Sequence, residues 1–308
     1  MADAKRVNVA ERKQPARGGA ADAMQNGTAA AVKGRRPKLG QHFLADRGAA
    51  QRIVDALGDV SQTTVVEIGP GRGVLTGLLA ARAQRLIAIE LDRVLAAQLR
   101  MKFSAVQNVE IIEADVLSVD FSTLLGPRPG GLSALTATAP VKSRVVGNIP
   151  YYITSDILLR LFEYHECFES IVIMVQLEVA DRIVAKPGSR DYGLLSATAQ
   201  LYARIEKLFS LSPGAFAPPP KVHSAVLRFH IEPKWERLRV APQEFVEFLK
   251  ISFAKKRKML FNNLKSRYDA KQIRAALEKA KLRSDVRAES LPLEKAAVVF
   301  RALAGEHL

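Results

Sequence analysis

Short apolar runs alternate with amphipathic segments between residues 64 and 185. Runs rich in β-branched residues, such as 64–68 and 85–90, predict strands. Segments with apolar residues at helical spacing, such as 74–82 and 92–101, predict helices between them. Further strands are predicted at residues 109–113, 144–146 and 170–176, and further helices at residues 155–164 and 177–185. This alternation predicts an α/β fold with a parallel sheet that helices cover on both faces.

The pattern changes on both sides of this region. Beyond residue 231 it becomes purely helical, with helices predicted at residues 242–255, 257–265, 270–280 and 292–303. Residues 1–38 show no sustained apolar periodicity, which predicts a disordered tail, and residues 126–140 predict a loop. We therefore predict a basic tail at residues 1–38, an α/β domain at residues 39–233 and a helical domain at residues 234–308.

Positive charge is concentrated at the two ends of the chain. The formal net charge of +15 comes from 46 Lys and Arg against 31 Asp and Glu. Residues 1–38 hold nine Lys and Arg against three acidic residues, and residues 234–308 hold 18 against nine, so these two parts supply the whole excess. Such an imbalance favours a polyanionic partner, either a nucleic acid or an anionic membrane surface.

The densest basic cluster is the run Lys255-Lys256-Arg257-Lys258. Two interpretations are open for it: an RNA-binding surface, or the solvated face of a helix whose other side is buried. Lys221, next to a proline-rich segment, is a further candidate contact for an RNA phosphate.

Composition excludes several classes of protein. No apolar run is long enough to span a bilayer, and the first residues lack the hydrophobic core of a secretory signal. Asp3, Glu11 and Asp22 disfavour a transit peptide. The single cysteine, Cys167, excludes an intramolecular disulfide framework and a cysteine-based zinc site, and the five histidines show no metal-ligand spacing. We expect a soluble, cytoplasmic, monomeric protein with no metal and no membrane segment.

A glycine-rich turn follows the first of these strands. The segment Glu67-Ile68-Gly69-Pro70-Gly71-Arg72-Gly73 joins this strand to a helix, and its glycines allow the backbone to approach a ligand closely. The dinucleotide fingerprint requires G-x-G-x-x-G, whereas this turn has G-x-G-x-G, which favours a smaller ligand. Glu90, at the next strand end, could accept hydrogen bonds from both hydroxyls of a ribose, and Asp115 could accept one from an adenine amino group. The alternative for Glu90 and Asp115 is a solvated strand end or a helix N-cap.

The fourth of these strands leads into Asn148-Ile149-Pro150-Tyr151. Asn148 offers a side-chain amide oxygen, and Pro150 keeps Ile149 extended so that the Ile149 carbonyl is a second acceptor. Tyr151 adds an aromatic face. Two acceptors and a ring suit a flat base held by its exocyclic amine, although Asn-x-Pro also predicts an ordinary turn. Ligands of such sheets bind at the carboxyl ends of the strands, so we expect Asn148 beside the glycine turn.

These motifs resemble the S-adenosylmethionine pocket of Rossmann-like methyltransferases. Two further segments, Gly40-Gln41-His42-Phe43-Leu44 and Phe216-Ala217-Pro218-Pro219-Pro220-Lys221-Val222, narrow the resemblance. From about residue 39 to residue 303 the chain resembles the ribosomal RNA adenine dimethyltransferase family of the KsgA type. Residues 174–180 and 192–196 are similar to the bacterial small-subunit enzymes more than to the macrolide-resistance (Erm-type) large-subunit methylases. The resemblance implies a Rossmann-like methyltransferase fold with a small C-terminal all-helical domain.

The resemblance also implies which residues bind S-adenosyl-L-methionine. They are His42, Leu44, Glu67, Gly69, Gly71, Glu90, Asp115 and Asn148. His42 and Leu44 would cover the cofactor from the N-terminal side, and Asn148 would bridge cofactor and target. The family usually has Asn where this chain has His42, and the predicted loop at residues 126–140 is longer than usual.

The implied reaction is the transfer of methyl groups to N6 of two adjacent adenosines near the 3′ end of small-subunit (16S) rRNA, within the immature small ribosomal subunit. Adenine N6 is a weak nucleophile because its lone pair is delocalised into the ring. Asn148 and the Ile149 carbonyl would polarise the amine, while Tyr151 would stack on one face of the base. Phe216 is the candidate for the other face, and its alternative role is a hydrophobic anchor beneath the proline-rich segment.

Other functions remain open. The same chemistry could act on large-subunit rRNA, as in Erm-type enzymes, or the chain could be a non-catalytic RNA-binding assembly factor with this fold. A pure binding protein has no need of the clamp formed by Asn148 and Tyr151, which argues against the second alternative. The spacing of the glycines disfavours an NAD-dependent dehydrogenase.

Overall fold

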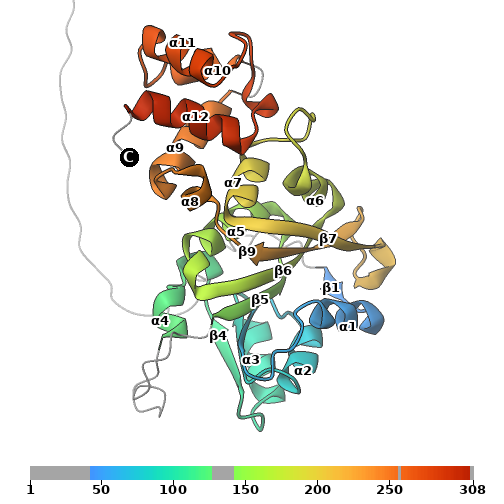
Figure 1. The fold of residues 1–308 in the computed structure, drawn as a ribbon. Helices are drawn as coiled ribbons and strands as arrows, with labels where there is room; N and C mark the ends of the chain where they lie inside the picture. The colour runs from blue at the N-terminus through green and yellow to red at the C-terminus, as the bar shows by residue number, and fades with distance from the viewer. Residues whose placement is uncertain (1–41, 127–141, 256–257, 306–308) are drawn as a thin grey trace, which may run out of the picture. The chain divides into compact units, whose positions relative to one another are not determined.

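Seven strands form one sheet within residues 42–126, 142–255 and 258–305, the parts of the chain that the computed structural model describes (Figure 1). Their bounds are Thr64–Ile68 (β2), Arg85–Glu90 (β3), Val109–Glu113 (β4), Ser143–Asn148 (β5), Phe168–Gln176 (β6), Ala203–Leu211 (β7) and Ser224–Ile231 (β9). The order across the sheet is β4-β3-β2-β5-β6-β9-β7. The strands from β4 to β6 run parallel to one another, as the alternating pattern predicts.

The prediction of a purely parallel sheet is wrong at β9, which runs antiparallel to both β6 and β7. Residues 212–223, which connect β7 to β9, are all described and include no α-helix. Without a helical crossover the chain returns directly beside β7, and β9 therefore runs in the opposite direction. The connection includes the short strand β8 (Phe216–Ala217), which pairs with β1 (Phe43–Leu44) near the start of the described chain.

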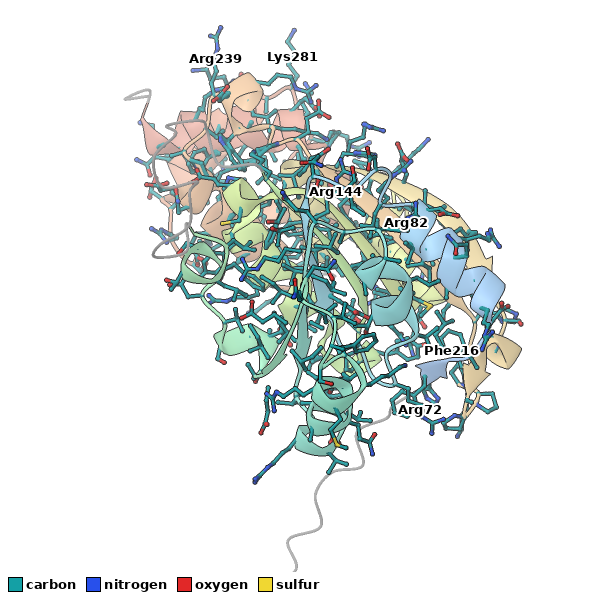
Figure 2. The ribbon with its side chains drawn as sticks, turned by 90° about the horizontal axis from the view of Figure 1, so that it is seen from below. Arg72, Arg82, Arg144, Phe216, Arg239 and Lys281 are labelled. Carbon is teal, nitrogen blue, oxygen red and sulfur yellow. The ribbon has the colours of Figure 1, made fainter. Side chains whose placement is uncertain are left out.

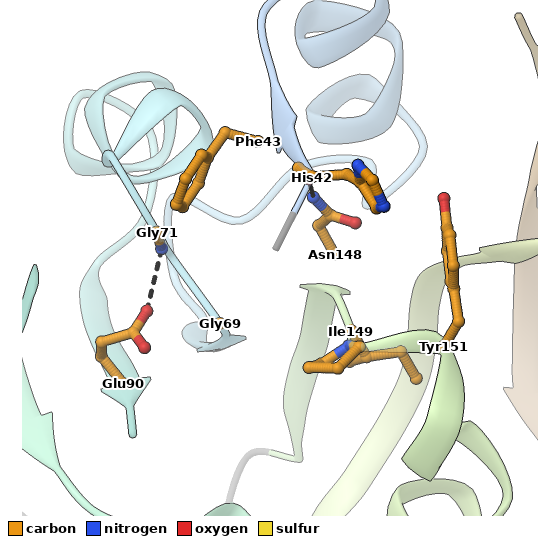
Figure 3. Close-up of a pocket in the computed structure, with 9 residues that line it drawn as sticks. His42, Phe43, Gly69, Gly71, Glu90, Asn148, Ile149 and Tyr151 are labelled. Carbon is orange, nitrogen blue, oxygen red and sulfur yellow. Dashed lines mark hydrogen bonds between the residues drawn. The ribbon is translucent and has the colours of Figure 1, made fainter. Parts of the chain in front are cut away.

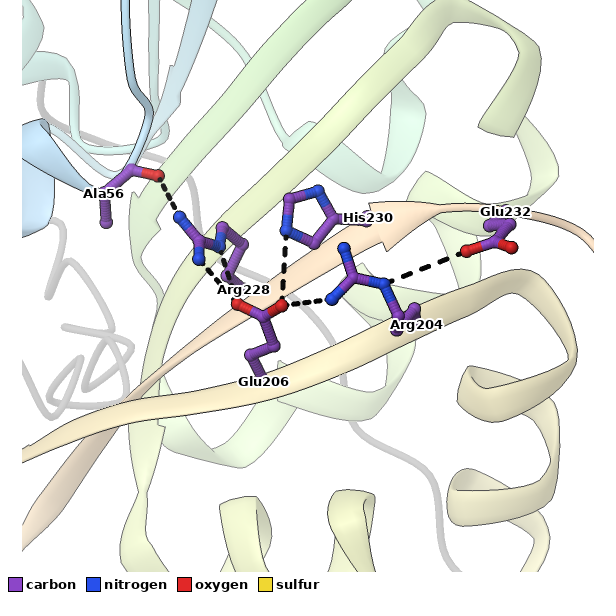
Figure 4. A network of polar contacts seen from close by, with 6 residues as sticks. All are labelled: Ala56, Arg204, Glu206, Arg228, His230 and Glu232. Atoms are coloured by element: carbon purple, nitrogen blue, oxygen red, sulfur yellow. Dashed lines mark hydrogen bonds and ion pairs between the residues drawn. The ribbon is translucent and has the colours of Figure 1, made fainter.

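A polar network joins β7 to β9 and explains why the pattern did not predict β7 (Figure 4). Glu206 of β7 lies opposite Arg228 of β9 and accepts hydrogen bonds from its Nε at 3.1 Å and its Nη2 at 2.5 Å. Bonds from Arg228 and then from Arg204 hold the pKa of Glu206 below its usual range. Arg228 also donates to the carbonyl of Ala56 at 3.3 Å. Cross-strand charge pairs of this kind stabilise an edge strand that lacks a clear apolar face.

Helices pack on both faces of the sheet because successive residues of a strand point to opposite sides. Val65 and Val146 belong to a core that includes residues of α1 and α2, whereas their neighbours Val66 and Val145 belong to a core with residues of α5 and α6. The helices of this part are α1 (Arg47–Asp55), α2 (Val74–Ala80), α3 (Arg93–Lys102), α4 (Phe121–Leu125), α5 (Thr154–Glu163), α6 (Leu177–Val184) and α7 (Leu194–Tyr202). α1, α4 and α7 were not predicted, and residues 127–140 of the predicted loop lie outside the described residues.

The C-terminal helices share their hydrophobic core with the preceding part of the chain. They are α8 (Trp235–Leu238), α9 (Pro242–Phe253), α10 (Leu260–Leu264), α11 (Ala270–Lys279) and α12 (Leu293–Ala304). Their core contains the tilted ring pair of Phe248 and Phe300. It also contains Tyr192, Ala197 and Leu201 from the preceding part of the chain. The domain boundary at residue 234 therefore stays a prediction, and the predicted tail at residues 1–38 lies outside the described residues. Within the described ranges, no helix is long and apolar enough to cross a membrane.

The described part of the predicted basic cluster lies outside the helices. The predicted helix at residues 257–265 begins only at Leu260, and the exposed residues Lys255 and Lys258 both lie between the end of α9 and the start of α10. Lys256 and Arg257 lie outside the described residues. Asn263 is 5% exposed, and its Nδ2 donates to the carbonyls of Ser252 at 2.6 Å and Lys255 at 3.3 Å. It thus satisfies carbonyls at the end of α9 that have no partner within the helix.

We expect the substitution Asn263→Ala to lower the free energy of unfolding by about 1–3 kcal/mol, because it removes the donor of a buried hydrogen bond to the Ser252 carbonyl. Urea denaturation followed by circular dichroism measures the change. The control is Asn262→Ala, which alters the exposed neighbour in the same helix and should change stability by less than about 0.5 kcal/mol. Equal effects of the two substitutions would show that the Asn263 amide does not hold this turn.

Candidate active site

The carboxyl ends of three adjacent parallel strands meet at one pocket. Ile68 of β2 pairs with Ile89 of β3 and with Gly147 of β5, so the residues that follow these pairs come together. The pocket is lined by His42, Phe43, Gly69, Gly71, Glu90, Asn148, Ile149, Pro150 and Tyr151 (Figure 3). An adjoining pocket shares Gly69, Glu90 and Pro150 and extends to Asp115. The motifs predicted from sequence therefore lie side by side, although 106 residues separate His42 from Asn148.

The glycine turn follows β2 in a left-handed backbone conformation. Gly69 has φ +67°, and a Cβ at this position would lie 3.2 Å from the Asn148 carbonyl oxygen. Gly71 has φ +56°, and its Cβ would lie 2.8 Å from Cδ1 of Phe43. Both positions exclude larger residues, because the backbone conformation and the close neighbour each disfavour a side chain. The turn thus brings bare backbone to the wall of the pocket.

Glu90 ends β3 and anchors the glycine turn. Its Oε2 accepts a hydrogen bond from the Gly71 N–H at 3.0 Å, and its Oε1 accepts one from the Asp92 N–H at 2.9 Å. Burial of this side chain, which is 5% exposed, raises the pKa of the carboxyl, while the two N–H groups oppose the rise. Each carboxylate oxygen accepts more than one hydrogen bond, so the group can also receive ligand hydroxyls.

Glu67 lies one layer deeper, within β2. Its side chain is 1% exposed, and its Oε2 makes no hydrogen bond with a described residue. Burial, reinforced by the negative charge of Glu90, raises the pKa of the Glu67 carboxyl to about 7. It lines a small space below the glycine turn together with Leu44 and Leu75. A direct role of Glu67 in cofactor binding stays a prediction.

Asn148, the last residue of β5, is held in one orientation by the main chain. Its Nδ2 donates to the carbonyl oxygen of His42 at 3.0 Å. A carbonyl can only accept, so the amide nitrogen must face His42 and the amide oxygen must face the other way. Figure 3 shows this oxygen on the side of Tyr151. The site therefore presents an acceptor toward the space between Asn148 and Tyr151.

Tyr151 forms the opposite side of that space. Its hydroxyl shares a hydrogen bond of 2.7 Å with Ser224, which is fully buried at the start of β9. Burial raises the pKa of the Tyr151 phenol above its usual value of 10.0, so the ring is neutral at physiological pH. Ser224 was not identified from the sequence, because no local pattern indicates that β9 returns beside the end of β5.

Asp115 follows β4 and lines the adjoining pocket. Its Oδ1 accepts a hydrogen bond from the Leu117 N–H at 3.0 Å, so it is an N-cap, as the alternative interpretation expected. The other oxygen is without such a bond to the described residues. The remaining walls are mostly apolar and include Leu91 and Ile157. An apolar slot with one carboxylate at its edge suits a purine ring, and the contact of Asp115 with adenine stays a prediction.

Phe216 does not line either pocket. Its side chain, labelled in Figure 2, is 4% exposed. It belongs to the same buried cluster as Leu44 and Leu211. β8 pairs with β1, which places Phe216 opposite Leu44. This placement agrees with the anchoring alternative, because a side chain packed among apolar neighbours has no free face for a base.

Lys221 is exposed on the segment that follows β8, and its contact with RNA stays a prediction.

Phe43 is a pocket residue that the sequence did not single out. Its ring packs against Gly71 and lies 4.7 Å from the guanidinium carbon of Arg72. The signal was present, because residues of a strand alternate sides: Leu44 faces the buried cluster, so Phe43 faces the pocket. A segment as short as Phe43–Leu44 gives too few residues to recognise that alternation.

Known proteins resemble this chain over most of its length. The family model described as ribosomal RNA adenine dimethylase matches residues 32–304. The chain is 59% identical to "Ribosomal RNA small subunit methyltransferase A" of Koribacter versatilis, over 87% of this chain and 94% of the relative. It is 52% identical to the protein of the same name from Acidobacterium capsulatum, over 89% of this chain and 93% of the relative.

Two solved structures share the fold. The 23S rRNA methyltransferase ErmE has a TM-score of 0.61 and 27% identity, and the match covers 85% of this chain and 99% of that chain. A dimethyladenosine transferase from Plasmodium falciparum has a TM-score of 0.68 and 23% identity, with 84% and 96% covered.

We expect Glu67→Gln to remove a pH dependence of stability. Because the pKa of Glu67 is raised on folding, its favourable contribution to the free energy of unfolding is complete below about pH 4.5. This contribution is lost as the pH rises toward 7. At pH 8 the variant should therefore be more stable than the native protein by up to about 3 kcal/mol, and the difference should vanish near pH 3.5. Urea unfolding at both pH values measures it, with the exposed Glu278→Gln as control. A gain that is equal at both pH values would show that Glu67 does not titrate in this range.

Proposed function

Because the chain belongs to the ribosomal RNA adenine dimethylase family, we propose that it transfers methyl groups to N6 of two adjacent adenosines near the 3′ end of small-subunit rRNA, with S-adenosylmethionine as the donor. The observation that carries the proposal is the fixed Asn148 amide, whose oxygen faces Tyr151 across an open pocket. The names of the two relatives above 50% identity support the small subunit as the substrate.

The residues around the glycine turn fit S-adenosylmethionine. The absence of side chains at Gly69 and Gly71 leaves room against the backbone. Glu90 can accept further hydrogen bonds from ribose hydroxyls. The apolar slot beside Asp115 suits an adenine ring. When bound, the cofactor supplies an electrophilic methyl group. Gly69, Gly71, Glu90 and Asp115 would hold it at the carboxyl ends of the strands.

Asn148 and Ile149 would activate the acceptor. The Asn148 amide oxygen would accept a hydrogen bond from one N6–H, and the Ile149 carbonyl oxygen would accept one from the other. These two bonds favour a pyramidal nitrogen with a localised lone pair. Acceptors placed where positive charge develops act by electrostatic preorganisation. Holding N6 within roughly 3 Å of the methyl carbon supplies the positional part of the catalysis.

Tyr151 would offset the cost of unstacking the target base. The base must leave its stack to reach the pocket, and an aromatic platform recovers about 1–3 kcal/mol of that cost. The bond to Ser224 holds the phenol ring in place before the base arrives. Exposed cations such as Lys221, Lys255 and Lys258 would contribute to binding of the phosphate backbone without reading its sequence. A cytoplasmic location and a monomeric state stay predictions.

We expect Asn148→Ala to lower the rate of methyl transfer by about 100- to 1000-fold, because it removes one of two acceptors for the reacting amine. The affinity for S-adenosylmethionine, measured by calorimetry, should change much less than the rate. Asn262→Ala, remote from the pocket in α10, is the matched control and should keep full activity. An unchanged rate in Asn148→Ala would exclude the amine clamp.

The substrate is tested by incubating the protein with radiolabelled S-adenosylmethionine and unmethylated small or large ribosomal subunits. We expect label in the small subunit, and primer extension should stop at two adjacent adenosines near the 3′ end, because dimethylation blocks the pairing edge of the base. Label in the large subunit would favour the Erm-type alternative. Stable binding to small subunits without any transfer would favour an assembly factor.

A further inference from the structure

A second hollow lies at the carboxyl end of β6. Its volume is about 470 Å³, which is within the range of ligand-binding pockets. Its walls come from the start of α6, from the connection between α6 and α7 and from the segment that precedes β9. The polar residues that line it are Gln176, Glu178, Asp181, Asp191, Lys221 and His223.

The register of the sheet places this hollow near Tyr151. β6 runs parallel to β5, so its last residue, Gln176, lies at the same edge of the sheet as Asn148. Gln176 is also opposite Ser224 of β9, and residues opposite each other in an antiparallel pair point to the same face, with Cβ atoms about 5 Å apart. The Ser224 hydroxyl bonds to the Tyr151 hydroxyl at 2.7 Å. The hollow therefore lies close to the hydroxyl end of Tyr151, outside the pocket proposed for the target base.

The side-chain amide of Gln176 is available to a ligand. Gln176 is the N-cap of α6, but its side chain makes no cap hydrogen bond. The N–H of Leu177 is instead satisfied by the carbonyl oxygen of His223 at 2.9 Å. Within the described ranges the partly buried amide has no hydrogen-bond partner. A ligand that satisfies both its donor and its acceptor gains free energy, because shielded polar groups are costly to leave unpaired.

The chemistry of this amide matches adenine. A primary amide presents a donor and an acceptor side by side, which suits N7 and the N6 amino group of that base. Bases of single-stranded RNA expose these edges when they leave their stack. In the proposed reaction the target adenosine has an adenosine as its neighbour, so the amide lies where such a neighbour can be bound.

Lys221 supplies a cation at the rim of the hollow. It is exposed on the segment between β8 and β9. Two of the acidic residues nearby are already paired: Glu178 accepts a hydrogen bond from Arg182 at 3.0 Å, and Asp181 accepts one from Lys207 at 2.7 Å. Their negative charge is thus partly compensated, and Lys221 can contact a phosphate of the bound strand.

We propose that this hollow receives the nucleotide next to the target, and that Gln176 binds the N6 and N7 edge of a neighbouring adenine. The inference rests on the proposed function, because it presupposes an RNA substrate with two adjacent adenosines. It deepens that function by assigning a residue to the recognition of the neighbour. Such a contact forms both before and during the reaction, so its loss raises KM for RNA more than it lowers kcat.

The test compares Gln176→Leu with the native protein in methyl transfer to unmethylated small ribosomal subunits. Leucine keeps the approximate size of the side chain and removes the amide, and thermal melting checks that the variant is folded. We expect KM for the subunit to rise about tenfold, the effect of losing a bidentate contact to adenine, with kcat within about threefold. The control is Gln98→Leu, which alters an exposed glutamine of α3 and should leave both constants unchanged.

A second arm replaces one of the two adenosines at a time by guanosine, which has an acceptor at position 6 where adenine has a donor. For one of the two replacements, KM of the native protein and of Gln176→Leu should differ by less than about threefold, because the amide has lost its matching partner. An equal defect of the variant on all three substrates would overturn the proposal, since Gln176 would then act through Ser224 and Tyr151. An unchanged KM on subunits with both adenosines would also overturn it. Failure of the native protein to methylate small subunits would refute the proposed function itself.

Discussion

The in-register pairing of β2 with β3 and β5 is the constraint on which the site depends. Ile68 is paired with both Ile89 and Gly147, and a shift of one residue would turn every buried side chain of a strand toward the wrong face. Gly147 contributes to this register, because a Cβ there would lie 2.9 Å from the Ile68 carbonyl oxygen. With the register fixed, Gly69, Glu90 and Asn148 emerge together at the same edge of the sheet.

Sequence patterns predicted β2 and β3 well because nearly every residue of these two strands is buried. The bounds of β2, β3 and β4 agree with the prediction, and the match to ribosomal RNA adenine dimethylase confirms the family suggested by the motifs. The direction of β9 could not be predicted, since it depends on how residues 212–223 close and not on the composition of the strand itself. The edge strand β7 was missed because its polar residues are satisfied by partners on β9.

The site likewise contains residues that a local pattern predicts and partners that only the tertiary structure reveals. Residues at strand ends, such as Glu90 and Asn148, were predictable because parallel topology determines where they lie. The partners that orient them were not, because they come from segments far away in sequence: the His42 carbonyl holds Asn148, and Ser224 holds Tyr151. A proline-rich segment predicts stiffness, but the burial of Phe216 follows from the pairing of β8 with β1, and two-residue strands carry almost no signal.

The bond between Asn148 and the carbonyl of His42 has an evolutionary consequence. Any amino acid at position 42 supplies the same carbonyl. The backbone therefore sets the orientation of the Asn148 amide, and a substitution at position 42 does not change it. The side chain at this position is thereby released from one constraint, because a substitution there leaves the carbonyl that orients the Asn148 amide in place.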